Sequence, residues 1–422
     1  MHDLKWRAPL LAGAVALAAA APASAQYQPP PAEEGFEYVF DGTQASFDRW
    51  QDVNGAAFTL ETAPGPNQGA MNPGTSGFGM RWYPVEQLGD VVLKLDYMDG
   101  GDPDGPVSSN GGVMVRFPDP RVPFAERPLS YSYDWLGQDG PVPPPDTYTG
   151  TYCGRPGPND VGHANGSNAN AHEHWYSVYC GHEVQVNDTL QGVVDPKKTG
   201  SFYNFADLNA KQSRTNERTV KGTWHTMEIR MVGQQFTVLV DGNVINQFDN
   251  AIPKVASRGG DPPTQARQFA AGYVGLQSHG GNDRVFYRLI RVKDLSSAAV
   301  PESTKAPKVT GSGKVGRPLK CHDGKWRNGG QDREYAWFRS NAIDPSHPRY
   351  RAPTQQDLGN VTAPAESEYG PGTLPYAGSL QVGSGDRYRP VAEDVGKIVH
   401  CRVTATNDGA TVWETATAPE IR

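Results

Sequence analysis

Between residues 36 and 295, apolar and polar residues alternate in short segments that are separated by turns rich in Gly, Pro and Asn. None of these segments keeps a helical period over a dozen residues. Successive side chains of a strand point to opposite faces, so each segment should have one packing face and one polar face. The pattern predicts an all-β domain, built as an antiparallel jelly-roll sandwich. The segments are VVLKLDYM (91–98), GVMVRF (112–117), HEVQVN (182–187), WHTMEIRMV (224–232), FTVLVDG (236–242), YVGLQS (273–278) and VFYRLIRV (285–292).

A long interruption breaks this rhythm at residues 118–180, which are rich in Pro, Gly, Asn, Tyr and His. Cys153 and Cys180 lie inside it, so we expect one excursion that is closed by a disulfide. Loops of this length within a compact domain are usually functional or disordered. The many Tyr and Trp residues of the excursion argue against disorder.

A second domain is predicted after a linker of small residues and Pro at 296–307. Its Cys321, Trp337 and Cys401 follow the order Cys…Trp…Cys of an immunoglobulin-like sandwich. Residues 308–422 are therefore expected to form a smaller β-sandwich of that kind.

The stretch VAEDVGKIVHCRVTATN (391–407) resembles bacterial immunoglobulin-like repeats found on secreted proteins. Val399 stands two residues before Cys401, where antibody domains carry Tyr, so no tyrosine corner is expected at that position.

Residues 1–25 have the pattern of a secretory signal peptide. A positively charged start precedes an apolar run at 8–21, and an A-x-A site predicts cleavage after Ala25. The leader at 26–35 is polar and Pro-rich. No later segment is long and apolar enough for a transmembrane helix. We expect an exported protein, secreted or held in the cell envelope.

Four cysteines remain in a chain bound for an oxidising compartment. Four cysteines allow three connectivities. We favour Cys153–Cys180 and Cys321–Cys401, because each pair then lies within one predicted domain.

The formal net charge is −7 and the isoelectric point is about 5.8. This balance lacks the basic footprint of a nucleic-acid-binding protein, so no nucleic-acid partner is expected. Composition does not indicate an oligomeric state.

With its segments in this order, the first domain resembles the 3-keto-disaccharide hydrolase family, secreted jelly rolls related in fold to concanavalin A-like lectins and glucanases. The resemblance covers roughly 36–295, and the excursion at 118–180 departs from the compact family pattern. The matching pieces are FDGTQASFDRW (40–50), GFGMRWYPVEQLGDVVLKLDY (77–97), NGGVMVRF (110–117), HEVQVND (182–188), GSFY (200–203), KGTWHTMEIRMVGQQFTVLVDGNVINQF (221–248) and GYVGLQSHGGNDRVFYRLIRV (272–292).

The resemblance implies a 3-keto glycoside as substrate. A ketone at C3 of a sugar acidifies the proton on C2, so a base can remove it and the enolate then expels the substituent at C1. Addition of water completes a net hydrolysis. This chemistry needs a base, donors for the enolate oxygen and an acid for the leaving group. It does not need the two opposed carboxylates of ordinary glycosidases.

Three residues are candidates for that chemistry. Glu183 heads the polar face of HEVQVND and would act as base or acid. Arg116 would hold the enolate oxygen or a hydroxyl, and His279, where a strand ends at two glycines, would transfer the second proton. A solvated cross-strand ion pair between Glu183 and Arg116 is the structural alternative.

Amide and carboxylate side chains on the same polar faces would orient the sugar, because bidentate hydrogen-bonding groups suit its hydroxyls. These substrate-binding candidates are Gln185, Asn187, Asn110, Asp96 and Gln277.

A divalent metal could replace Arg116 as the electrophile. HEH at 172–174 has near metal-ligand spacing, and the Asp/Asn turn at 280–284 could bind calcium, but such turns usually hold no ion. No cofactor is firmly predicted. The alternative to an enzyme is a non-catalytic carbohydrate-binding or cell-surface adhesion protein, since lectin-like sandwiches often bind glycans without chemistry.

Overall fold

The computed structural model describes residues 27–74, 77–100, 109–121, 177–178, 180–187, 199–203, 205, 221–251, 264–329, 333–341 and 380–422. The predicted signal peptide, Cys153 and most of the predicted excursion lie outside the described residues. Within them, no helix is long and apolar enough to cross a membrane.

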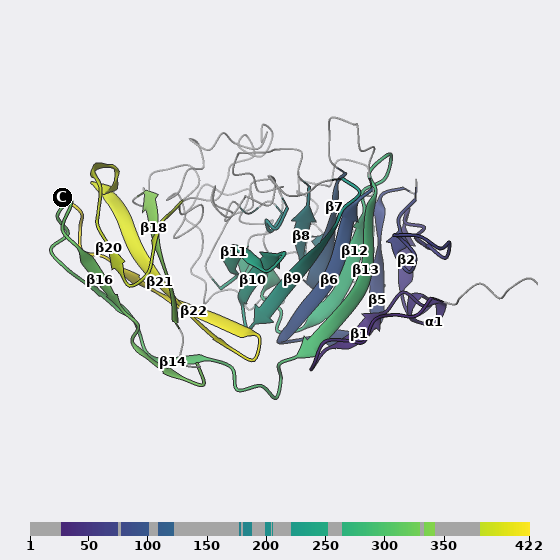
Figure 1. The fold of residues 1–422 in the computed structure, drawn as a ribbon, viewed down its shortest axis with the longest axis horizontal. Helices are drawn as coiled ribbons and strands as arrows, with labels where there is room; N and C mark the ends of the chain where they lie inside the picture. The colour runs from purple at the N-terminus through teal and green to yellow at the C-terminus, as the bar shows by residue number, and fades with distance from the viewer. Residues whose placement is uncertain are drawn as a thin grey trace, which may run out of the picture.

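The first part of the chain is an antiparallel sandwich of two sheets, which confirms the predicted all-β class (Figure 1). The helical pieces α1 (Gln44–Phe47) and η5 (Thr264–Arg267) are short. One sheet has eight strands in the order β11 (Asn243–Asp249), β10 (Gln235–Val240), β9 (Trp224–Val232), β6 (Val91–Asp99), β13 (Val285–Asp294), β4 (Met71–Asn72) and β3 (Thr59–Leu60), with β1 (Glu37–Phe40) also paired to β13. The other has five strands in the order β2 (Gln51–Asn54), β5 (Gly79–Leu88), β12 (Gly272–Ser278), β7 (Gly111–Phe117) and β8 (His182–Val186).

The core lies between the two sheets and takes one side chain in two from each central strand, as the alternation predicts. Leu93 and Leu95 of β6 meet Val113 and Val115 of β7 in one buried cluster, and Val184 of β8 belongs to it. The other side chains of each strand therefore point away from the core, to one of two outer faces.

His182 also faces this core. Its ring lies between 5.3 and 5.9 Å from the rings of Phe202, Phe205, Phe236 and Phe248. Its Nε2 makes a 3.0 Å hydrogen bond with Asn250 Oδ1. His182 is thus a packed, hydrogen-bonded histidine.

The C-terminal part consists of small antiparallel sheets around a disulfide. Cys321 and Cys401 are joined, as predicted, and Trp337 is fully buried in the same cluster. This order agrees with the immunoglobulin-like arrangement, which stays a prediction. The sheets are β14 (Glu302–Lys305) with β17 (Lys325–Arg327); β15 (Lys308–Thr310), β16 (Leu319–His322) and β20 (Arg387–Tyr388); and β19 (Leu380–Ser384), β18 (Arg333–Asn341), β21 (Lys397–Asn407) and β22 (Ala410–Thr417), with η6 at Ala392–Asp394.

The hairpin β21–β22 docks on the outer face of the eight-stranded sheet, near β9 (Figure 1). The side-chain amide of Gln235 pairs with the backbone of Trp413 twice, donating to its carbonyl at 2.9 Å and accepting from its N–H at 3.0 Å. Ala410 is fully buried against Val92 and Val232. The two parts of the chain therefore share an apolar and hydrogen-bonded interface.

We expect Ala410→Arg to destabilise this docking, because the new guanidinium would be buried among apolar side chains without a partner. The loss of unfolding free energy should lie toward the upper end of about 0.5–3 kcal/mol. Calorimetry should show unfolding at a lower temperature than in the wild type. Thr417→Arg, at an exposed position of the same strand, is the matched control. Equal melting curves for both variants would contradict the docking.

Candidate functional site

The outer face of the five-stranded sheet carries a row of side chains that point away from the core. Strand pairing sets Trp82 of β5 opposite Gly275 of β12, Gly275 opposite Met114 of β7, and Met114 opposite Glu183 of β8. Gln185 lies one row further along β8. We call the surface formed by these residues the five-strand face. Its members are Met80, Trp82, Met114, Glu183, Gln185, Gly275 and Gln277.

Two glycines open the middle of this face. A Cβ on Gly112 would collide with Glu183 Oε1 and lie 2.7 Å from its Cγ, so the carboxyl lies directly over this glycine. From the core side, the hydroxyl of Tyr287 accepts a 3.1 Å hydrogen bond from the Gly112 N–H. The second glycine, Gly275, leaves room that Met80 partly fills, with its sulfur 3.1 Å from where a Cβ would stand.

The Glu183 carboxyl is buried without compensation. The residue is 3% exposed, and its Oε1 has no hydrogen-bond partner among the described residues. Burial raises the pKa of Glu183 to about 8, because the charged form is poorly solvated there. A group of this kind is largely protonated at neutral pH and becomes a base within reach of ordinary conditions.

Two more buried polar atoms of the same face lack partners within the described part of the chain. They are Trp82 Nε1, which can only donate, and Gln277 Oε1. The ring of Trp82 packs perpendicular to Tyr273 at 5.0 Å, and the Arg121 guanidinium lies 5.1 Å from its centroid. A ligand could satisfy these atoms while packing against aromatic surface.

Hydrogen bonds tie the rim of this face together. Gln185 Nε2 donates to Asn110 Oδ1 at 2.6 Å and to Gly111 O at 2.8 Å. The Asn110 N–H donates to Asp283 Oδ1 at 3.0 Å, and His279 Nδ1 lies 2.6 Å from Asp283 Oδ2. The structure thus connects three predicted site residues, Gln185, Asn110 and His279, through a fourth that the sequence did not single out.

Asn187 follows β8 and is half-buried. Its backbone N–H donates to Thr199 Oγ1 at 2.9 Å, and its carbonyl accepts from the Thr199 N–H at 3.0 Å. These bonds fix the end of β8, and a sugar-binding role for the side chain stays a prediction. Cys180, on the chain entering β8, is disulfide-bonded.

Arg116 does not share the five-strand face with Glu183, so that expectation was wrong. A bulge places Val115 opposite Val274 and Phe117 opposite Tyr273, which leaves Arg116 unpaired with φ at 57°. Its guanidinium turns to the end of the sandwich, where it donates to Phe269 O at 2.8 Å and to Gly89 O at 2.7 Å. Arg116 is 1% exposed and braces these loops.

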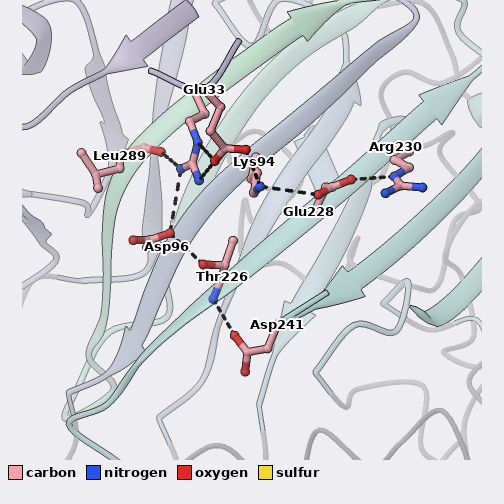
Figure 2. Close-up of polar contacts among 9 residues, drawn as sticks. Glu33, Lys94, Asp96, Thr226, Glu228, Arg230, Asp241 and Leu289 are labelled. Carbon is pink, nitrogen blue, oxygen red and sulfur yellow. Dashed lines mark hydrogen bonds and ion pairs between the residues drawn. The ribbon is translucent and has the colours of Figure 1, made fainter. Parts of the chain in front are cut away.

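Asp96 also lies away from Glu183, which corrects its expected role in orienting substrate there. It belongs to β6 and points to the outer face of the eight-stranded sheet. There it accepts from Thr226 Oγ1 at 3.1 Å and from Arg288 Nε at 3.4 Å. Figure 2 shows the polar network that continues from Asp96 toward Glu228.

The structure offers no group of three His, Cys, Asp or Glu side chains that could hold a metal among the residues it describes. HEH at 172–174 lies outside them. In the turn at 280–284, both carboxylate oxygens of Asp283 are already used, one by His279 and one by Asn110. A divalent cation therefore stays a prediction without a located site.

Residues 166–293 match the family model described as a 3-keto-alpha-glucoside-1,2-lyase-like domain. The match spans less than half of the chain and includes Glu183, Gln185, Gln277, His279 and Asp283. A search of curated proteins found no match.

Among solved structures, a protein from Parabacteroides distasonis described as a candidate glycosyl hydrolase is 15% identical, with a TM-score of 0.37; the match covers 62% of this chain and 99% of that one. The carbohydrate binding module CBM66 from Bacillus subtilis is 12% identical over 58% of this chain and 96% of its own, with a TM-score of 0.29. A Bacillus subtilis protein of unknown function with a galectin-like fold is 9% identical over 60% and 92%, with a TM-score of 0.28. Similarities at these scores support no argument about function.

Sequence reasoning missed Trp82, Gly112 and Asp283. Trp82 alternates with core residues of β5, so the period-two pattern could have placed it on an outer face. The two glycines before VMVRF signal a close approach of another group. The bond from Asp283 back to His279 carried one local signal, the glycine pair between them, which permits a tight turn.

We expect the unfolding free energy of the wild type to fall with rising pH relative to that of Glu183→Gln. The carboxyl titrates near 4.5 when unfolded and near 8 when folded. Between these values the folded state binds the proton more strongly, so stability that is present at low pH is lost as pH rises through the folded pKa. The loss is about 1.4 kcal/mol per pH unit.

Thermal melts across this pH window measure the difference. Glu37→Gln, at an exposed position of β1, is the control and should give a constant difference from wild type. A Glu183→Gln difference that is equally flat would show that the carboxyl is solvated.

Proposed function

We propose that the first sandwich is an enzyme that cleaves 3-keto glycosides by elimination, with Glu183 as the catalytic base. The observation that carries this proposal is the buried Glu183 carboxyl, which lies over Gly112 without a partner among the described residues and has its pKa raised to about 8. Such a group becomes a base as the pH approaches 8, and it then takes a proton more strongly than a solvated carboxylate. The match of residues 166–293 to a 3-keto-alpha-glucoside-1,2-lyase-like domain supports the substrate class.

The proposed step balances as follows. Glu183 takes the proton from C2, and the electron pair of that C–H bond forms an enolate with the C3 ketone. The enolate then forms the C1–C2 double bond as the C1–O bond breaks, and the leaving oxygen takes a proton from Nε2 of His279 in its imidazolium form, which keeps its Nδ1–H. Water adding across the double bond makes the net result hydrolysis; without that step the activity is a lyase.

With Arg116 elsewhere, the enolate oxygen needs another donor. Trp82 Nε1 is a buried N–H with no partner among the described residues, and it lies in the same row of the five-strand face as Glu183. A buried donor that is already in place stabilises developing charge more than a solvated one. Gln185 and Gln277 would bind the remaining hydroxyls.

Glu183→Gln should lower kcat for a 3-keto glucoside by roughly 10²–10⁴-fold, because the amide cannot take the C2 proton. In the wild type, kcat/KM should rise with pH up to about 8, where the carboxylate becomes populated. Release of the C1 substituent measures both. Wild-type rates in Glu183→Gln would exclude the proposed base.

Gly112→Ala should also lower turnover, because the new Cβ would displace the Glu183 carboxyl. The matched control is Gly275→Ala, on the same face, where the new methyl would meet the flexible side chain of Met80 at 3.1 Å. Turnover should fall much more in the first variant than in the second, with both melting temperatures recorded. Equal turnover in the two would show that the position of Glu183 over Gly112 is unimportant.

A glycan-binding protein without chemistry is the second candidate, favoured by the buried polar atoms near Trp82 and Tyr273 that have no partner in the described part of the chain. Calorimetric titration with unoxidised glycosides, and product analysis with their 3-keto forms, separates the two. Binding without product would decide for the lectin.

A further inference from the structure

Asp283 holds two groups of the rim at once. Its Oδ2 lies 2.6 Å from His279 Nδ1, and its Oδ1 accepts from the Asn110 N–H at 3.0 Å. The chain returns from His279 to Asp283 through Gly280 and Gly281, which have φ values of 85° and 63°. These left-handed positions suit glycine, so the turn that brings the carboxylate to the ring is encoded locally.

The carboxylate fixes which nitrogen of His279 carries the proton. A carboxylate can only accept, so the neutral ring must present Nδ1–H to it and keep its lone pair on Nε2. The imidazole is about two-fifths exposed, and its edge packs against the ring of Phe78 at 5.4 Å. The contacts with Asp283 and Phe78 therefore set the tautomer and the orientation of the ring.

The same carboxylate holds the backbone of Asn110, whose side chain contacts Gln185. Asn110, held by Asp283, accepts from Gln185 Nε2, which also donates to Gly111 O. A backbone carbonyl can only accept, so the amide cannot be flipped and the Gln185 oxygen is left as an acceptor. Gln185 stands two residues from Glu183 on the same face of β8.

We propose that Asp283 is the positioning residue of this site: it fixes His279 as the Nδ1–H tautomer and holds the Asn110 backbone, whose side chain accepts from Gln185 Nε2. Asp283 acts through these groups and touches no reacting atom. The part that concerns turnover rests on the proposed function; the part that concerns the tautomer does not.

Asp283→Asn in the full chain tests this inference, because the shape is kept and one acceptor becomes a donor. The amide oxygen can still accept from Asn110, but the amide nitrogen then faces His279 Nδ1. We expect ¹⁵N NMR to show His279 change to the Nε2–H tautomer, with its signals assigned by their loss in His279→Gln. For a 3-keto glucoside, kcat should fall by roughly 10²–10⁴-fold with a smaller change in KM, because an amide N–H facing Nδ1 disfavours the imidazolium form that donates the proton.

The chain contains a matched control. On the other sheet, His225 Nδ1 lies 2.8 Å from Asp241 Oδ2, and Asp241 Oδ1 accepts from the Thr226 N–H at 3.0 Å. Asp241→Asn should change the His225 tautomer in the same way and leave turnover at the wild-type level.

An unchanged His279 tautomer in a folded Asp283→Asn protein would overturn the inference. A changed tautomer with wild-type turnover would also overturn it. That outcome would not bear on Glu183 as the base, which Glu183→Gln tests separately. If the wild type had no activity on 3-keto glycosides, the proposed function would fail while the tautomer measurement would still decide the role in positioning.

Discussion

The packing of Val184 and Val186 into the core decides to which face the remaining side chains of β8 point. Both valines are buried between the sheets, so Glu183 and Gln185 must project from the opposite side of the strand. A slip of one residue would bury the polar set and expose the valines. The strongly favourable burial of apolar side chains thus forces a carboxyl into a place where solvation is poor.

Ionising the Glu183 carboxyl at this buried position is unfavourable, and the described residues do little to stabilise the charge. Among the described residues no cation approaches Glu183, and burial alone raises its pKa. Tyr287, beneath Gly112, has its own pKa raised by burial and then by the neighbouring Glu183 charge. Stable proteins seldom keep such a group unless it is used, so a carboxyl that resists ionisation is a candidate acid or base.

The alternation of apolar and polar residues was enough to predict the strands, the sandwich and the side of β8 that faces the core. It could not say to which of two sheets a strand belongs, and this is why Asp96, on a strand with equally good alternation, was grouped with Glu183. It also could not foresee the bulge at Arg116, because one extra residue changes the register without a local sequence signal. The bond between Asp283 and Asn110 joins segments far apart in the chain, so it needed the fold.

The two outer faces of the sandwich carry two different kinds of polar side chain. On the eight-stranded sheet, Arg291 pairs with Glu33 at 2.7 Å. Lys94 also reaches Glu33 at 2.7 Å (Figure 2). Paired, partly exposed charges of this kind contribute little and are typical of a solvated surface.

On the five-stranded sheet, Glu183 Oε1, Trp82 Nε1 and Gln277 Oε1 are buried and have no partners among the described residues. A buried polar atom without a hydrogen bond lowers the stability of the folded protein. Selection for stability alone would replace such a residue. A ligand that supplies the missing hydrogen bonds recovers this free energy on binding, so the same atoms that weaken the free protein favour occupancy of the face. The five-strand face differs in that three such atoms lie on it, and one of them belongs to a carboxyl whose pKa burial raises to about 8.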